Sequence, residues 1–137
     1  MFWVASSRKD ARRFPKAVRQ TVGQALFDAQ TGGKHPNAKP LKGFKGAGVL
    51  EVVEDDDGST YRAVYTVKFA GFVYVLHAFQ KKSKAGRKTP AEELDVVKSR
   101  LREAEKHHAE WREQQEREAQ GGSGGYAVRA EQRECVR

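Results

Sequence analysis

The sequence contains a single cysteine, Cys135, and no apolar run that approaches the roughly 18 to 20 residues needed to cross a bilayer. A lone thiol forms no internal disulfide and joins no thiolate metal cluster, which excludes disulfide-stapled and zinc-finger classes of protein. The apolar opening, Met1 to Ala5, is too short for the core of a signal peptide. A chain of 137 residues buries enough surface for one core but not for two. We therefore expect one soluble, cytoplasmic domain without membrane contact.

Acidic residues are scarce over most of the first ninety positions. Residues 1–50 carry ten bases and two acids, and residues 61–90 carry seven bases and no acid, whereas five acids are confined to residues 51–60. The whole chain has 26 Lys and Arg against 18 Asp and Glu, a net charge of +8. A field of this kind attracts a polyanion or an acidic partner protein. The alternative is a basic surface that only confers solubility.

The first third of the chain has helical patterning between two short irregular stretches. Residues 2–5 favour a short strand, and a helix is predicted to begin near Ser7, with Asp10 in its first turn. Pro15 fits poorly inside a helix, so we expect a short first helix and a second one that opens near Pro15 and ends at Gly32 and Gly33. Residues 35–48, rich in proline, glycine and lysine, are predicted to form a basic loop.

From residue 49 the pattern alternates with a period of two. Strands are predicted over residues 49–54, 61–69 and 72–81, joined by turns centred on Asp57-Gly58 and Ala70-Gly71. The result is an antiparallel meander. The side chains predicted to lie on the helix-covered face are, on the second strand, Tyr61, Ala63, Tyr65, Val67 and Phe69 and, on the third, Phe72, Tyr74, Leu76 and Ala78.

The last third predicts one amphipathic helix and a tail. Thr89 to Glu92 has the pattern of a capping box with proline at the first helical position. Spacings of three and four then place one apolar stripe on the helix, which we interpret as core packing: Leu94, Val97, Leu101, Ala104, His108 and Trp111. We expect the compact domain to cover residues 1–111, and residues 112–137 to be a polar helical extension and a flexible Gly/Ser-rich tail.

The two predicted turns bring chemistry-bearing side chains together. In that register Val64 lies opposite His77 and Glu51, Arg62 opposite Phe79, and Thr60 opposite Lys81. Parity then places Glu51, Arg62, His77 and Lys81 on one face. Cleavage of RNA by its own 2′-hydroxyl needs a proton acceptor, cationic groups for the phosphorane and a proton donor for the leaving oxygen. This cluster contains candidates for all three roles.

Each candidate also has a structural interpretation. Arg62 can form a salt bridge with Glu51 or Glu54, and His77 can be a satisfied structural histidine. The run Lys81 to Lys84 can be a solvated edge, and Lys42 and Lys45 are better suited to solvation or phosphate positioning than to catalysis. The adjacent His107 and His108 lack a ligand partner at metal-binding spacing, so we expect neither a metal nor a cofactor.

Several segments resemble one family. They are Lys39 to Phe44, Tyr61 to Tyr65, Val75 to Ser83 and Thr89-Pro90, the most specific being Leu-His-Ala-Phe-Gln-Lys-Lys-Ser at the end of the predicted third strand. Over about residues 1–110 the chain resembles the phage-derived HigB-like branch of the RelE/ParE superfamily of toxins from type II toxin–antitoxin systems. The resemblance implies an α+β, RelE-like fold, with N-terminal helices packed on a twisted antiparallel sheet and a further helix after the last strand.

The resemblance also implies an activity and a site. Relatives of the RelE type are metal-independent endoribonucleases that cut messenger RNA on the ribosome and are silenced by an antitoxin, in this branch often a helix-turn-helix protein. By resemblance Arg62 stabilises the scissile phosphate, Lys81 and Lys82 hold the backbone and the transition-state charge, and His77 transfers a proton. One departure is Val53, where many relatives have arginine. The basic residues expected to contact RNA are Lys39, Lys42, Lys45, Lys84, Arg87 and Lys88.

A second hypothesis comes from the ParE arm of the same superfamily. A toxin of that arm poisons DNA gyrase by protein contact and cuts no RNA. The nuclease hypothesis predicts that Arg62→Ala abolishes cleavage while the fold survives. Oligomeric state and codon preference are open at this point.

Overall fold

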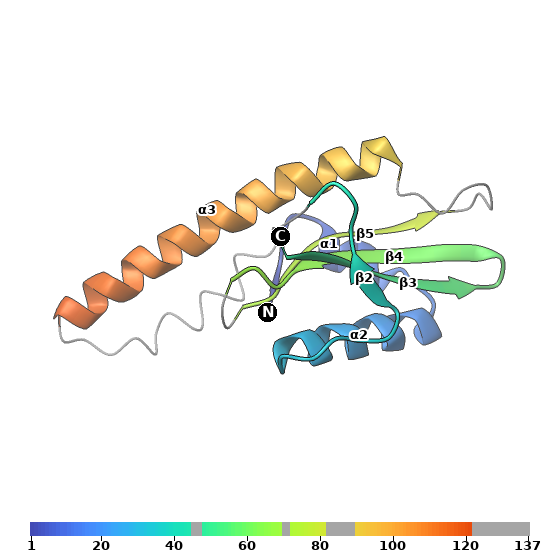
Figure 1. Cartoon of the computed structure of the whole chain (residues 1–137), viewed down its shortest axis with the longest axis horizontal. Coiled ribbons are helices and arrows are strands. Elements are labelled where there is room, and N and C mark those ends of the chain that lie inside the picture. The colour runs from blue at the N-terminus through green and yellow to red at the C-terminus, as the bar shows by residue number, and fades with distance from the viewer. Residues whose placement is uncertain (45–47, 70–71, 82–89, 122–137) are drawn as a thin grey trace.

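The computed structural model describes residues 1–44, 48–69, 72–81 and 90–121. Eight elements follow one another along the chain (Figure 1). They are β1 (Phe2–Trp3), α1 (Ser7–Arg12), α2 (Lys16–Gln30), β2 (Ala38–Pro40), β3 (Val49–Asp56), β4 (Ser59–Thr66), β5 (Tyr74–Lys81) and α3 (Ala91–Gly121). None of the helices in these described ranges is long and apolar enough to span a membrane.

The strands form one five-stranded sheet in the order β1-β5-β4-β3-β2. The predicted α+β class, the two N-terminal helices and the helix after the last strand are confirmed. The meander of β3, β4 and β5 is antiparallel as predicted, but β1 pairs parallel with β5, so the sheet is mixed. The predicted loop over residues 35–48 contains a further strand, β2, which pairs with β3.

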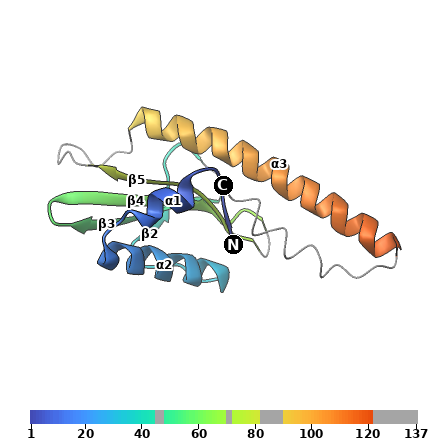
Figure 2. The same ribbon diagram turned by 180° about the vertical axis from the view of Figure 1, so that it is seen from behind.

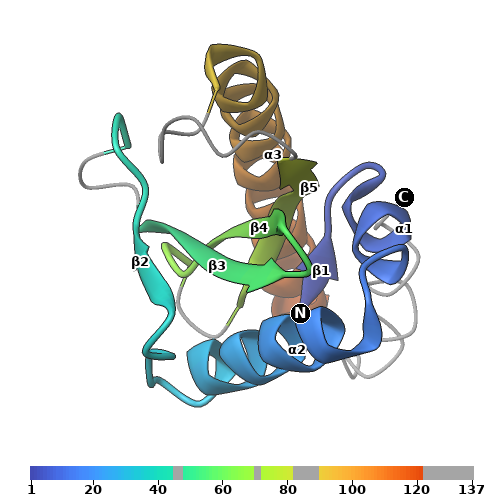
Figure 3. The ribbon, with the colours of Figure 1, turned by 90° about the vertical axis from the view of Figure 1, so that its right-hand side faces the viewer.

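Helices cover both faces of the sheet. Figure 3 shows α2 on one side and α3 on the other, and Figure 2 shows α1 lying across the strands next to α2. The core consequently has two halves. The half under α1 and α2 is built around Val18, Leu26, Val52 and Tyr65, and the half under α3 around residues such as Leu76. The sequence prediction covered only one face with helices, because the apolar stripe of the last helix carries no information about which face it meets.

The turn between β3 and β4 has the predicted centre. Asp57 and Gly58 both have positive φ, 50° and 81°, as a two-residue hairpin turn requires. This turn sets the register that places Glu51 opposite Val64. The three predicted pairs between β4 and β5 are also present: Val64 with His77, Arg62 with Phe79 and Thr60 with Lys81. β4 ends at Thr66, earlier than predicted, and β3 begins opposite that residue. The predicted centre of the next turn lies outside the described residues.

A β-bulge corrects the predicted faces. Val64 pairs with His77 and Tyr65 with Val75, so Leu76 is an extra residue on β5. The alternation of faces shifts by one residue at that point. Tyr74 and Leu76 consequently pack under α3, whereas the prediction placed them on one helix-covered face with Ala63 and Tyr65, which pack in the other half of the core.

Helix α3 is longer than the sheet that it covers. Its 31 residues extend about 46 Å at 1.5 Å per residue, whereas eight-residue strands extend about 26 Å. The C-terminal part of the helix therefore projects past the sheet, as Figure 1 shows. The predicted tail beyond residue 121 lies outside the described residues, and the boundary predicted at residue 111 stays a prediction.

Two histidines of α3 pack into an aromatic cluster at the end of the sheet. His107 contacts Phe2, and its Nδ1 lies 2.9 Å from the Tyr74 hydroxyl. His108 packs against Phe69 and Phe72. Burial lowers the pKa of His107, against a smaller opposing effect of Glu110. Burial also lowers the pKa of His108, and so do its charged neighbours Arg112 and His107.

Acid is expected to destabilise this cluster. A histidine with a lowered pKa in the folded state binds more protons when unfolded, so its contribution to stability is complete above the ordinary pKa of 6.5 and is lost as pH falls through the lowered value. The thermal unfolding temperature of the wild type should therefore fall from about pH 7 to about pH 5. A variant carrying His107→Gln and His108→Gln should show a shallower decrease, and the control His35→Gln should match the wild type. Equal acid sensitivity of the double variant would contradict the prediction.

Candidate functional site

One face of the sheet, the face toward α3, collects the ionisable residues of the predicted site. A row across four strands places Lys39 of β2 opposite Glu51 of β3, Glu51 opposite Val64 of β4, and Val64 opposite His77 of β5. The next row toward the β3–β4 turn contains Arg62. The predicted common face of Glu51, Arg62 and His77 is therefore present, although all three side chains are nearly buried.

Glu51 and Arg62 form a buried ion pair. The Arg62 Nη1 donates to Glu51 Oε1 at 2.9 Å, and each residue is only 3% exposed. Lys39 Nζ lies 3.9 Å from the same carboxylate oxygen, and its own side chain is 58% exposed. The same carboxylate oxygen thus lies near a buried guanidinium and a solvated ammonium. One of the two salt bridges considered for Arg62, that with Glu51, is the one observed.

His77 is held on both ring nitrogens. Its Nε2 lies 2.6 Å from Glu93 Oε1, and its Nδ1 lies 3.2 Å from Arg100 Nη1. A guanidinium N–H only donates, so the Nδ1 atom accepts, and the ring proton is assigned to Nε2, which donates to Glu93. With 7% of its surface exposed and a stacked contact with Phe79, His77 has the environment of a structural histidine. Its predicted role in proton transfer stays a prediction.

Arg100 connects three parts of the fold. Besides His77 it donates to the Leu76 carbonyl oxygen at 3.0 Å and to Ser6 Oγ at 3.1 Å. Ser6 donates in turn to Asp10 Oδ2 at 2.9 Å. The Leu76 carbonyl belongs to the extra residue of the β-bulge, so this guanidinium satisfies a backbone group in an irregular part of β5. Arg100 therefore joins α3 to β5 and to the segment before α1.

Glu93 and Arg100 are the two site residues that the sequence analysis missed. Both lie at helical spacing from buried positions of α3, since residues 93, 97, 100 and 104 follow one another at intervals of four, three and four. Val97 and Ala104 are fully buried on that line. A polar residue in line with buried apolar positions was the signal that could have identified them.

The predicted basic residues are only partly assembled. Lys81 is half-buried and lies opposite Thr60, one register row beyond Arg62. Lys42 is exposed just after β2. The predicted positions that lie outside the described residues are Lys45, Lys82, Lys84, Arg87 and Lys88. Within residues 1–44, 48–69, 72–81 and 90–121, no group of three or more His, Cys, Asp or Glu side chains could hold a metal ion.

The arrangement suits anion binding better than a metal or a nucleophile. Lys39, Arg62 and Lys81 come from three different strands and belong to one sheet face, with Glu51 orienting the guanidinium. The N–H groups of an arginine match a phosphate, and Glu51 fixes the orientation of the buried Arg62 guanidinium. The exposed Lys39 and the half-buried Lys81 beside it supply charge without fixed geometry.

Comparison with known proteins gives one match. The model of the family described as "Phage derived protein Gp49-like (DUF891)" matches residues 9–102, which is more than half of the chain. That range includes α2, the meander and the first part of α3. No curated protein and no solved structure matches the sequence.

Proposed function

The chain belongs to the phage-derived Gp49-like family, which is part of the RelE/HigB-like superfamily of toxin–antitoxin toxins, and from this premise we propose that it is a ribosome-dependent endoribonuclease that cuts messenger RNA. In this reaction the 2′-hydroxyl attacks the adjacent phosphorus, the bond to the 5′-oxygen breaks, and a 2′,3′-cyclic phosphate is left. The partner implied by the family is an antitoxin.

The observation that carries the proposal is the convergence of one ionised side chain from each of four strands. Lys39, Glu51, Arg62 and Lys81 belong to β2, β3, β4 and β5 and occupy neighbouring register rows of one face. Three of the four are cationic, and a phosphorane carries more negative charge than the phosphodiester from which it forms. Cations that are already in place stabilise that charge without reorganisation.

The roles follow from exposure. Lys39, with most of its side chain in solvent, and Lys81, half-buried, contact the RNA backbone. Arg62, oriented by Glu51, supplies the fixed positive charge behind them. Direct proton transfer by His77 requires that Glu93 leave Nε2, and the ribosome-bound RNA is proposed to cause this displacement. Lys42, Lys45, Lys82, Lys84, Arg87 and Lys88 are proposed to extend the basic surface along the RNA.

The burial of the central residues favours a second candidate. A toxin that acts only by protein contact, such as a gyrase poison of the ParE type, needs no accessible Arg62 or His77. Glu51, Arg62 and His77 would then be structural, and the exposed basic residues alone would be functional.

The deciding experiment maps new 5′-ends on messenger RNA after brief induction of the protein in cells. Wild type should produce cuts within translated frames. Lys81→Gln should lower cleavage about 100-fold, as expected for loss of one transition-state cation. The matched control Lys98→Gln changes an exposed lysine of α3 away from the site and should cleave normally.

Two outcomes would reject the proposal or part of it. Undiminished cleavage by Lys81→Gln would remove Lys81 from the site. Growth arrest with intact messenger RNA and damaged DNA would replace the nuclease with the gyrase poison.

A further inference from the structure

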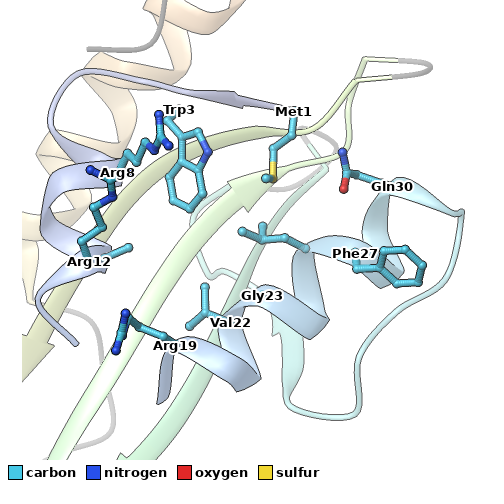
Figure 4. Close-up of a pocket in the computed structure, with 11 residues that line it drawn as sticks. Met1, Trp3, Arg8, Arg12, Arg19, Val22, Gly23, Phe27 and Gln30 are labelled. Carbon is cyan, nitrogen blue, oxygen red and sulfur yellow. The ribbon is translucent and has the colours of Figure 1, made fainter. Parts of the chain in front are cut away.

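A groove lies on the opposite side of the sheet from the candidate site. It is formed by β1, α1 and α2, has a volume of about 270 Å³, and is lined mainly by apolar surface (Figure 4). An apolar cavity of about 150 Å³ accommodates a benzene ring, so the groove has room for one aromatic or leucine side chain. Trp3, Val22 and Leu26 are among its lining residues.

Exposed apolar side chains extend the groove to the protein surface. Phe27 is 58% exposed and Met1 is 42% exposed, and both line it. In the described part of the chain the one other exposed large apolar residue is Val67, at 39%. Contiguous apolar surface on a small protein marks an interaction site.

Three arginines border this apolar surface. Arg8 and Arg12 come from α1 and Arg19 from α2, and Figure 4 shows their side chains along one side of the groove, away from Phe27. All three are exposed, and no carboxylate of the described residues forms a salt bridge with them. No acidic residue lines the groove. The charge of the rim is therefore complementary to an acidic partner.

Gly23 keeps the groove open. It lies in the interior of α2, where glycine costs about 1 kcal/mol relative to alanine. A Cβ atom added there would meet nothing within 4 Å. Packing inside the molecule thus gives no reason for glycine at this position, whereas a larger side chain would project into the groove.

We propose that the groove docks an acidic amphipathic segment of a partner protein, whose large apolar side chain enters between α1 and α2 while its carboxylates meet Arg8, Arg12 and Arg19. This inference rests on the proposed function in one respect: the partner segment is identified as part of the antitoxin. The protein's own residues 122–137 are a poor occupant, since they carry three bases against two acids. Because the sheet separates the groove from Arg62, docking there leaves the cationic face unoccupied.

The test uses purified full-length protein and a displayed library of helical peptides. Peptides are selected on the wild type and counter-selected on Gly23→Phe, which fills the groove. Enriched peptides should combine a large apolar residue with flanking Asp or Glu, and fluorescence anisotropy should give affinities that weaken with added salt. Arg12→Glu should lower affinity about tenfold or more through like-charge repulsion, whereas Arg13→Glu, at the exposed residue that follows α1 and outside the groove, should not. Gly23→Ala should bind like the wild type.

Each outcome decides the matter. The proposal would be overturned if the peptides bound Gly23→Phe equally well, if the binders were rich in Lys or Arg, or if no peptide were enriched. It would also be overturned if the wild type bound an RNA oligonucleotide and Gly23→Phe abolished that binding. A second copy of this chain as the occupant would appear as a dimer that Gly23→Phe dissociates, which also overturns it. Peptide binding is measured without cleavage, so failure of the groove and failure of the nuclease are distinguished.

Discussion

Arg62→Ala is expected to lower the free energy of unfolding by about 3 to 5 kcal/mol, because it leaves the Glu51 carboxylate buried without its guanidinium. Both side chains are about 95% shielded from solvent, so water cannot replace the lost partner. Lys39 remains 3.9 Å from the carboxylate and limits the loss to the lower part of that range. The measurement is urea unfolding of the purified variant beside the wild type.

A double variant distinguishes the cost of leaving Glu51 without its guanidinium from the effect of removing the whole ion pair. Replacing Arg62 with Met and Glu51 with Leu removes both ions at once, and such replacements by packed apolar groups are often neutral or stabilising. We expect this variant to be within about 1 kcal/mol of the wild type in stability and yet to be inactive as a nuclease. A double variant as unstable as Arg62→Ala would contradict the ion-pair argument.

The expected instability of Arg62→Ala changes how a loss of cleavage by this variant is interpreted. The sequence-based expectation was that Arg62→Ala would keep its fold and lose cleavage. A domain of this size is stable by only about 5 to 15 kcal/mol, so the single variant loses a large share of that stability. Inactivity of Arg62→Ala alone therefore identifies no catalytic role. A stable but inactive double variant would assign a catalytic role to the Glu51–Arg62 pair, and a stable double variant that still cleaves RNA would assign the pair to structure.

The register of the site was predictable because turns determine it. Asp57 and Gly58 accept positive φ, so the turn centre is readable from the residue types, and the pairing of Glu51 with Val64 follows by counting. Counting from the next predicted turn placed His77 opposite Val64, which is observed, although Tyr65 and Thr66 pair with Val75 and Tyr74, one residue away from the counted register. What counting could not reveal is the bulge at Leu76, since no residue type there requires it.

The burial of the site could not be predicted from the sequence, for a different reason. The stripe of α3 predicts that the helix packs, but not on which face of the sheet, and that choice decides whether Arg62 and His77 face solvent or a helix. The partners of His77 come from α3, 16 and 23 residues away in the sequence. Long-range polar contacts of this kind depend on the docking of the helix, which local patterns do not encode.

Arg100→Ala is the other substitution with a large expected effect, a loss of about 2 to 3 kcal/mol in the free energy of unfolding. One guanidinium donates to the Leu76 carbonyl oxygen, to His77 Nδ1 and to Ser6 Oγ. A hydrogen bond from a charged group contributes about 1.5 to 3 kcal/mol, and its loss leaves buried acceptors unsatisfied. The matched control is Arg102→Ala, two residues on and exposed, which should change stability by less than about 0.5 kcal/mol.

The effect of Arg100 should reach the sheet through His77. Without the guanidinium, Nδ1 has lost its donor and the ring is free to turn, so the bond from Nε2 to Glu93 should weaken as well. In a double-mutant cycle with Glu93→Gln, the two changes should therefore be less than additive. Nuclear magnetic resonance of the His77 ring should show a changed tautomer in Arg100→Ala but not in Arg102→Ala. Additive losses with an unchanged tautomer would mean that Arg100 acts only on Leu76 and Ser6, and that α3 is attached to the sheet independently of His77.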